Sequence, residues 1–167
     1  LEFCSKKKFV GNNKKVYVKY KRFAKDVKIG EKLLIDDGKL IFEILETDNV
    51  YNVKARVIQG GTLLSKKGIN LPNTKISLPA LTEKDIEDAL FSINQKVDWI
   101  ALSFVRNGND LNKLKKIIEE KSKHKIPIIS KIEKPEALEN IDEIISNSDG
   151  IMVARGDLGV EVSAAKV

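Results

Sequence analysis

The sequence predicts an α/β fold in which a small antiparallel β unit precedes a unit of alternating strands and helices. Three observations indicate this. Short apolar runs typical of strands recur early in the chain, a cluster of glycines and prolines follows, and helical periodicity begins beyond Pro79. The 167 residues, 42% hydrophobic and 32% charged, have the composition of a globular protein with a buried core. Neither a disordered nor a fibrous chain fits this mixture.

The β unit is predicted from runs of β-branched and alternating apolar residues, namely Val16–Val18, Leu33–Ile35, Leu40–Leu45 and Val50–Ile58. Asp36-Asp37-Gly38 has the residues that a hairpin turn requires, because glycine tolerates positive φ and aspartate bonds its own following backbone. Gly60-Gly61, Gly68 and Pro72 mark the end of this unit. We therefore expect one domain over residues 1–70 and a second over residues 71–167.

The second unit begins with a helix expected over residues 83–95, where apolar residues follow helical spacing and Thr82 with Asp85 resembles a capping box. Strand-like runs follow at Val97–Val105, Ile126–Ile132 and Gly150–Ala154, with helical patterns between them. Strict alternation with apolar strands predicts a parallel sheet buried on both faces, either doubly wound or part of a (β/α)8 barrel.

Polar residues at the strand ends favour the barrel. Each predicted strand runs into charged or hydroxyl groups, which are Ser103, Arg106, Ser130, Lys131, Glu133, Arg155 and Asp157. No Gly-x-Gly-x-x-Gly follows a strand, so the dinucleotide-binding pattern of a doubly wound sheet is missing. We expect part of a (β/α)8 barrel whose chemistry lies at the carboxyl ends of its strands.

Two carboxylates and a lysine stand out at these strand ends. Glu133 and Asp157 are one βα unit apart, hence on neighbouring strand ends, and carboxylate oxygens suit a hard cation such as Mg²⁺. Lys131 precedes Glu133 by two residues and projects to the same face, where an ammonium group neutralises charge on a phosphoryl or enolate oxygen. A turn is expected over Gly156-Asp157-Leu158-Gly159, and its exposed amides around Gly156 and Asp157 are accessible to an anionic substrate group. A surface salt-bridge cluster is the alternative interpretation of the same residues.

The positive charge is confined to the first part of the chain. Residues 1–70 hold 16 Lys and Arg against 8 Asp and Glu, whereas residues 71–167 hold 14 against 16. Either a solvated lysine surface or attraction of an anionic ligand such as a nucleotide explains this. The single Cys4 excludes an internal disulfide, and no apolar run approaches the roughly 18 residues of a membrane span.

Several segments resemble the pyruvate kinase family. Ile128–Glu133 and Ser148–Glu161 are similar to its signature region, Ala101–Arg106 to its fourth barrel strand, and Ser65–Pro72 with Leu78–Asp85 to the junction where its small β lid rejoins the barrel. The resemblance runs along the whole chain and is weakest in residues 1–60. It implies a partial (β/α)8 barrel of TIM type with an inserted small antiparallel β-barrel lid domain.

The resemblance implies transfer of a phosphoryl group from phosphoenolpyruvate to ADP, giving pyruvate and ATP, with Mg²⁺ and K⁺. Lys131 matches the lysine that stabilises the transferring group and the enolate. Glu133 and Asp157 match the Mg²⁺ carboxylates, and Lys67 matches a nucleotide contact from the lid. The positions that match substrate contacts are Lys131, Gly156, Asp157, Ser103 and Phe104.

The resemblance also implies that this chain is a segment of a longer cytoplasmic homotetramer, with an organellar copy as an alternative. The family's K⁺ contacts and several substrate contacts come from strands outside the chain, so we expect the isolated chain to be inactive. Ser163 and Ala165 stand where the family commonly has proline and glutamate. Two other functions remain open: a Mg²⁺-dependent lyase of a related pyruvate or enolate barrel family, and a non-catalytic binding module. The arginine-poor, aromatic-poor β unit counts against nucleic acid as a partner.

Overall fold

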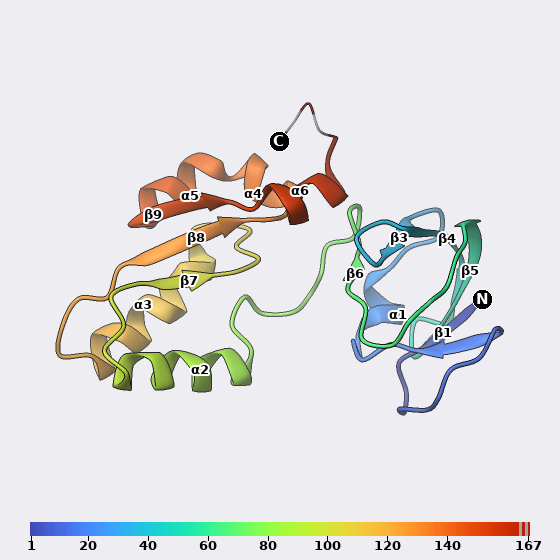
Figure 1. Ribbon diagram of the computed structural model, residues 1–167, viewed down its shortest axis with the longest axis horizontal. Coiled ribbons are helices and arrows are strands. Elements are labelled where there is room, and N and C mark those ends of the chain that lie inside the picture. The colour runs from blue at the N-terminus through green and yellow to red at the C-terminus, as the bar shows by residue number, and fades with distance from the viewer. Residues whose placement is uncertain (164, 166) are drawn as a thin grey trace. The chain divides into compact units, whose positions relative to one another are not determined.

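The computed structural model describes residues 1–163, 165 and 167. The chain forms two compact units, Leu1–Ser77 and Leu78–Val167 (Figure 1). This division lies beyond the expected boundary at residue 70, because the intervening segment remains bonded to the first unit. Leu71 is buried in the core of that unit, the Thr74 hydroxyl donates to Glu31 over 2.6 Å, and the Ser77 amide donates to Asp26 over 2.8 Å.

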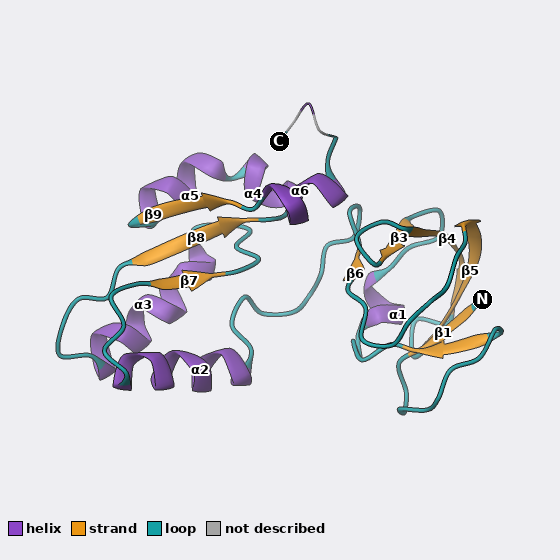
Figure 2. Ribbon diagram, in the orientation of Figure 1, coloured by secondary structure: helices purple, strands orange, loops and turns teal. Residues whose placement is uncertain are grey.

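The first unit is a six-stranded sheet with one short helix, α1 (Phe23–Asp26), and the strand order β2-β1-β5-β4-β3-β6. Figure 2 shows strands of this unit together with α1. Its strands are β1 (Glu2–Cys4), β2 (Lys15–Tyr17), β3 (Lys32–Ile35), β4 (Leu40–Thr47), β5 (Asn52–Gln59) and β6 (Ile69–Asn70). The four predicted runs correspond to β2 to β5, whereas β1, α1 and β6 were not predicted.

The expectation of an antiparallel β unit is wrong at one pair of strands, because β1 and β2 pair in parallel. The loop between them carries the chain back to the start of β1, where the Lys15 ammonium lies 2.5 Å from the Glu2 carboxylate. The remaining neighbours in the sheet are antiparallel.

Aromatic packing and one tight turn define the β unit. Phe3 lies edge-on to Phe23 and Phe42, with ring centroids 6.1 and 5.3 Å apart. Between β3 and β4, Asp36, Asp37 and Gly38 have φ values of 55, 56 and 81°. The predicted hairpin turn is therefore confirmed, and it places Asp36 and Asp37 in the left-handed region that short polar side chains tolerate.

The second unit is an α/β layer around the parallel sheet β7-β8-β9. Its elements are α2 (Glu83–Asn94), β7 (Ile100–Leu102), α3 (Asn109–Lys121), β8 (Ile128–Ile132), α4 (Pro135–Glu139), α5 (Ile141–Asn147), β9 (Gly150–Val153) and α6 (Arg155–Glu161). The alternation of helix and strand, the parallel sheet and the Thr82–Asp85 capping box are confirmed. The segment from Gly156 to Gly159, expected as a turn, is instead part of α6.

The core of this unit lies between the sheet and its helices. Leu111 and Leu114 of α3, Ile128 and Ile132 of β8, and Ile144 of α5 are at most 1% exposed. The expected burial of the sheet on both faces does not extend to β9, whose Ile151, Met152 and Val153 are 37, 43 and 51% exposed. Within the described residues β9 is an edge strand that pairs only with β8, so its outer side has no strand to cover it.

Candidate active site

The carboxyl end of β8 brings three predicted site residues together. The Lys131 ammonium lies 2.5 Å from Glu133 Oε1 and donates to the Ser103 hydroxyl over 2.9 Å. Residues at i and i+2 share one side of an extended chain, which explains why Lys131 and Glu133 meet. Ser103 follows β7, whose Leu102 is paired with Ser130 of β8. Parallel pairing therefore delivers the hydroxyl to the lysine.

Glu133 is the most buried charged residue of this group, at 2% exposed. Its second oxygen, Oε2, accepts a hydrogen bond of 2.7 Å from the backbone amide of Phe104. Phe104 has a φ of 57°, which is rare for a bulky residue, and the residue is 53% exposed. Such strain persists where surrounding structure fixes it and is concentrated at functional sites. Glu133 thus connects the ends of β7 and β8.

Gly156 and Asp157 occupy the first turn of α6, just beyond β9. Pairing of Ile132 with Val153, and a 3.1 Å hydrogen bond from the Ala154 amide to the Ile132 carbonyl, place the start of α6 beside Glu133 in the sheet order. Asp157 is exposed, and no hydrogen bond or ion pair joins its side chain to another described residue. A Cβ added at Gly156 would meet no atom within 4 Å. This turn is therefore open to a ligand.

Glu133 and Asp157 fit a divalent cation by the chemistry of their donors. Mg²⁺ prefers oxygen ligands and usually takes one or two carboxylates together with water and substrate oxygens. Asp157 has both carboxylate oxygens available among the described residues, and each Glu133 oxygen keeps a second lone pair beyond the one that accepts from Lys131 or Phe104. No cluster of three or more acidic, histidine or cysteine side chains suited to a metal occurs in the described part of the chain. This chain would thus supply two carboxylate ligands to a divalent cation.

Two of the polar residues at the strand ends have structural roles instead. Ser130 is fully buried, and its hydroxyl lies 2.6 Å from that of Ser148. The Arg106 guanidinium pairs with Asp110, which lies in the first turn of α3, over 3.3 Å. Both side chains are thereby held within the fold, so the strand ends supply fewer site residues than the sequence pattern suggests.

Lys67 lies in the first unit, where its ammonium is 2.9 Å from Asp36 Oδ1. The hydrogen bond from Lys67, together with the charge of Lys39, holds the pKa of Asp36 below its usual value. Asp36 was expected only as a turn residue, and its pairing with Lys67 was not predicted. Pairing of β3 with β6 brings Lys67, which lies just before β6, close to the turn that follows β3. A prediction of this strand pairing would therefore have indicated the contact between Lys67 and Asp36.

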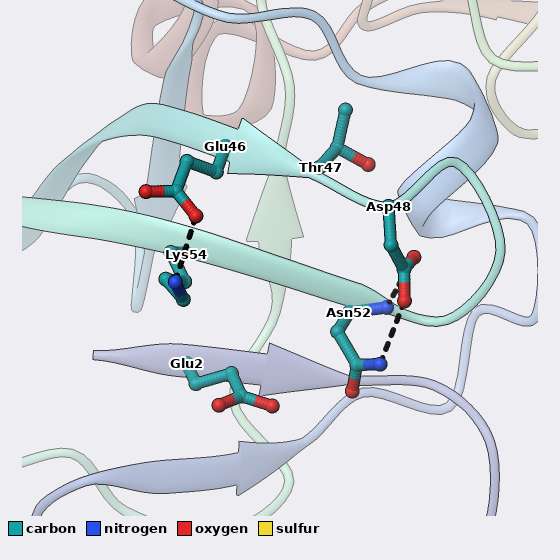
Figure 3. A pocket seen from close by; sticks show the side chains of 6 residues that line it. All are labelled: Glu2, Glu46, Thr47, Asp48, Asn52 and Lys54. Carbon is teal, nitrogen blue, oxygen red and sulfur yellow. Dashed lines mark hydrogen bonds and ion pairs between the residues drawn. The ribbon is translucent and has the colours of Figure 1, made fainter.

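A pocket of about 350 Å³ in the first unit contains none of the predicted site residues (Figure 3). Its lining residues are Glu2, Glu46, Thr47, Asp48, Asn52 and Lys54. They largely bind one another: Lys54 pairs with Glu46 over 2.7 Å, and Asp48 accepts the Asn52 side-chain amide over 2.7 Å (Figure 3). The pocket therefore offers little unpaired charge to a nucleotide.

Comparison of the sequence with known proteins identifies the family of this chain. A family model described as "Pyruvate kinase, barrel domain" matches residues 1–167. The chain belongs to the pyruvate kinase family. It is 44% identical over 156 residues to a pyruvate kinase of Candida albicans and 44% identical over 159 residues to one of Geobacillus stearothermophilus. It is also 46% identical over 151 residues to pyruvate kinase 2 of Synechocystis.

These pyruvate kinases are longer than the present chain. The matches cover 93, 95 and 90% of this chain but 31, 27 and 25% of the three relatives. The chain therefore spans about a quarter to a third of their length. Among the described residues, no helix is long and apolar enough to cross a membrane.

Proposed function

We propose that this chain is part of a longer pyruvate kinase, which transfers a phosphoryl group from phosphoenolpyruvate to ADP and gives pyruvate and ATP. The observation that carries the proposal is the Lys131 ammonium, held by Ser103 and Glu133 at the carboxyl end of a parallel strand. Identity of 42 to 46% with the pyruvate kinases compared supports it.

Lys131 is the residue to which we assign the chemistry. Phosphoryl transfer depends on positioning and on stabilisation of charge, and it requires no nucleophile from the protein. The ammonium of Lys131 stabilises negative charge on the transferring phosphoryl group and on the enolate that remains. Ser103 and Glu133 hold the ammonium in place, while Phe104 and Ser103 contribute to the surroundings of the substrate phosphate.

Glu133 and Asp157 would hold Mg²⁺, which when bound supplies positive charge that stabilises oxygens of the reacting phosphate. The residues that bind K⁺ lie outside this chain in the proposed enzyme. The backbone amides of Gly156 and Asp157 receive the substrate carboxylate. The open space beside Gly156 supports this assignment, because glycine lets a ligand approach the backbone closely.

The first unit is proposed as the inserted β lid and the second as part of a (β/α)8 catalytic barrel. A parallel β7-β8-β9 sheet, alternating with helices, supports the barrel. In the lid, Lys67 contacts the nucleotide, and the lysine-rich surface attracts ADP. The longer enzyme is proposed to be a cytoplasmic homotetramer.

Pyruvate formation by the longer protein tests this proposal. With phosphoenolpyruvate, ADP, Mg²⁺ and K⁺, a lactate dehydrogenase-coupled assay should show pyruvate formation that requires ADP. Lys67→Met should raise the KM for ADP with little change in the KM for phosphoenolpyruvate. Lys28→Met, on the same unit, is the matched control. A Mg²⁺-dependent lyase would instead release pyruvate from a longer carbon chain without any nucleotide, and that result would contradict the proposal.

A further inference from the structure

Lys134 and Glu161 form an ion pair that is almost wholly removed from solvent, with their side chains 12 and 1% exposed. Taking an ammonium and a carboxylate out of water costs free energy that their attraction often fails to repay. Glu161 also ends α6, where the negative end of the helix dipole disfavours a carboxylate. Stability alone is therefore a weak explanation of the pair.

The two residues join the segment that carries Glu133 to the helix that carries Asp157. Lys134 directly follows Glu133, and its backbone is extended, with φ −124° and ψ 147°, as expected before Pro135. Glu161 lies four residues after Asp157 on α6. Residues at i and i+4 share one face of a helix, so Glu161 and Asp157 lie on the same face.

Among the described residues, α6 has one buried apolar side chain, that of Leu158, and Val162 packs against the core just beyond the end of the helix. These two apolar contacts anchor the short helix, but neither is directed at the segment that carries Glu133. Glu161 supplies a further point of attachment, and that point lies beside Glu133.

We propose that Lys134 and Glu161 are positioning residues that set the direction of the Asp157 carboxylate relative to Glu133. Through it they set the affinity for the divalent cation that Glu133 and Asp157 would bind. This inference rests on the proposed function.

Direct binding of Mn²⁺ to the longer protein, followed by electron paramagnetic resonance of the free ion, tests the inference. Lys134→Met should weaken Mn²⁺ binding by about 10- to 100-fold, the loss expected when a residue orienting a metal ligand is removed. Electrostatics alone predicts the opposite sign, because loss of a positive charge near two carboxylates strengthens cation binding. Lys134→Arg should keep the ion pair and bind Mn²⁺ nearly as the wild type does.

Lys84→Met is the matched control, since Lys84 pairs with Asp88 on the exposed surface of α2 over 2.7 Å. It should leave Mn²⁺ binding unchanged. In activity assays the half-saturating Mg²⁺ concentration of Lys134→Met should rise, while kcat at saturating Mg²⁺ changes far less. If Lys134→Met does not fold, Lys134→Met/Glu161→Leu replaces it, because an apolar pair removes the cost of an unpaired buried charge.

The outcomes separate this inference from the proposed function. Wild-type Mn²⁺ affinity in the folded Lys134→Met or double variant, together with loss of affinity in Glu133→Gln and Asp157→Asn, would overturn the positioning role and leave the metal site intact. Mn²⁺ binding that survives Glu133→Gln and Asp157→Asn would overturn the metal site, and the positioning role with it.

Discussion

Glu133 Oε2 lies 2.7 Å from the amide nitrogen of Phe104, so a buried carboxylate holds a bulky residue at a φ of 57°. The same carboxylate binds the Lys131 ammonium through its other oxygen. One side chain thus fixes both the strained turn after β7 and the lysine at the end of β8. The turn and the lysine are therefore coupled, and the strain of Phe104 has a measurable consequence.

The Phe104→Gly variant should be more stable than Phe104→Ala by about 1 kcal/mol in the free energy of unfolding, because glycine adopts positive φ without strain. Elsewhere the order is reversed, since glycine loses more backbone entropy on folding. Urea denaturation of Phe104→Gly and Phe104→Ala measures the difference, and both variants lose the same ring. Lys116→Gly and Lys116→Ala in the exposed face of α3 provide the control, with alanine the more stable. Equal or greater stability of Phe104→Ala would show that the turn is not strained.

Acid should destabilise the first unit partly through Asp48. Removal from water opposes its ionisation, but the amides of Asn52, Val50 and Tyr51 all donate to its Oδ1 at 2.7 to 2.8 Å, and together with the Asn52 side-chain amide they lower its pKa well below the usual value. Because the folded state binds the proton less readily than the unfolded state, this contribution is complete above the ordinary aspartate pKa of about 3.9 and declines as the pH falls below it.

Asp48→Asn should therefore lower the Tm at pH 7. Between pH 4 and pH 2, the Tm of this variant should fall less than the Tm of the wild type. Differential scanning calorimetry across this range measures both effects. Asp98→Asn, a change at an exposed aspartate of the second unit, is the control. A parallel fall of Tm with pH in wild type and Asp48→Asn would contradict the assigned role of Asp48.

The local structure at the predicted motifs could be anticipated from the sequence, because each depends on residues close together in the chain. The Asp36-Asp37-Gly38 turn and the Thr82–Asp85 capping box are of this kind. The meeting of Lys131 with Glu133 also follows from strand geometry over two residues. Glycines at positions 156 and 159 suggested a turn, yet burial of Leu158 favours α6 over the weak helix propensity of glycine.

Contacts between distant segments could not be anticipated in the same way. Pairing of β1 with both β2 and β5 depends on the path by which residues 5–14 bring the chain back to the start of β1. No local sequence pattern specifies this path. The hydrogen bond between Phe104 and Glu133 joins residues 29 positions apart in the chain, and the ion pair between Lys134 and Glu161 joins residues 27 positions apart. Sequence patterns identify such residues as polar strand ends but do not identify their partners.

The isolated 167-residue chain should show no detectable phosphoenolpyruvate turnover. Catalysis by positioning is lost steeply with misplacement, about 100-fold for 1 Å, and the described residues supply two carboxylates without a third ligand of that kind. The apolar edge strand β9 should also make the isolated chain self-associate. A coupled assay and analytical ultracentrifugation measure these properties. Met152→Lys, on β9, should reduce the association, and Met152→Leu is its control. Robust turnover by a monomeric chain would contradict both expectations.

Substitution of Lys131 by methionine in the longer protein tests the central claim most directly. Met preserves most of the side-chain volume but removes the charge that stabilises the transferring phosphoryl group. We expect kcat to fall by at least about 10²- to 10³-fold, the usual loss of a transition-state donor, with the circular dichroism spectrum unchanged. Lys125→Met is the control, because Lys125 pairs with Asp149 on the surface and its side chain is 81% exposed. Wild-type turnover by folded Lys131→Met would contradict the account and reduce the Lys131–Glu133 pair to a structural contact.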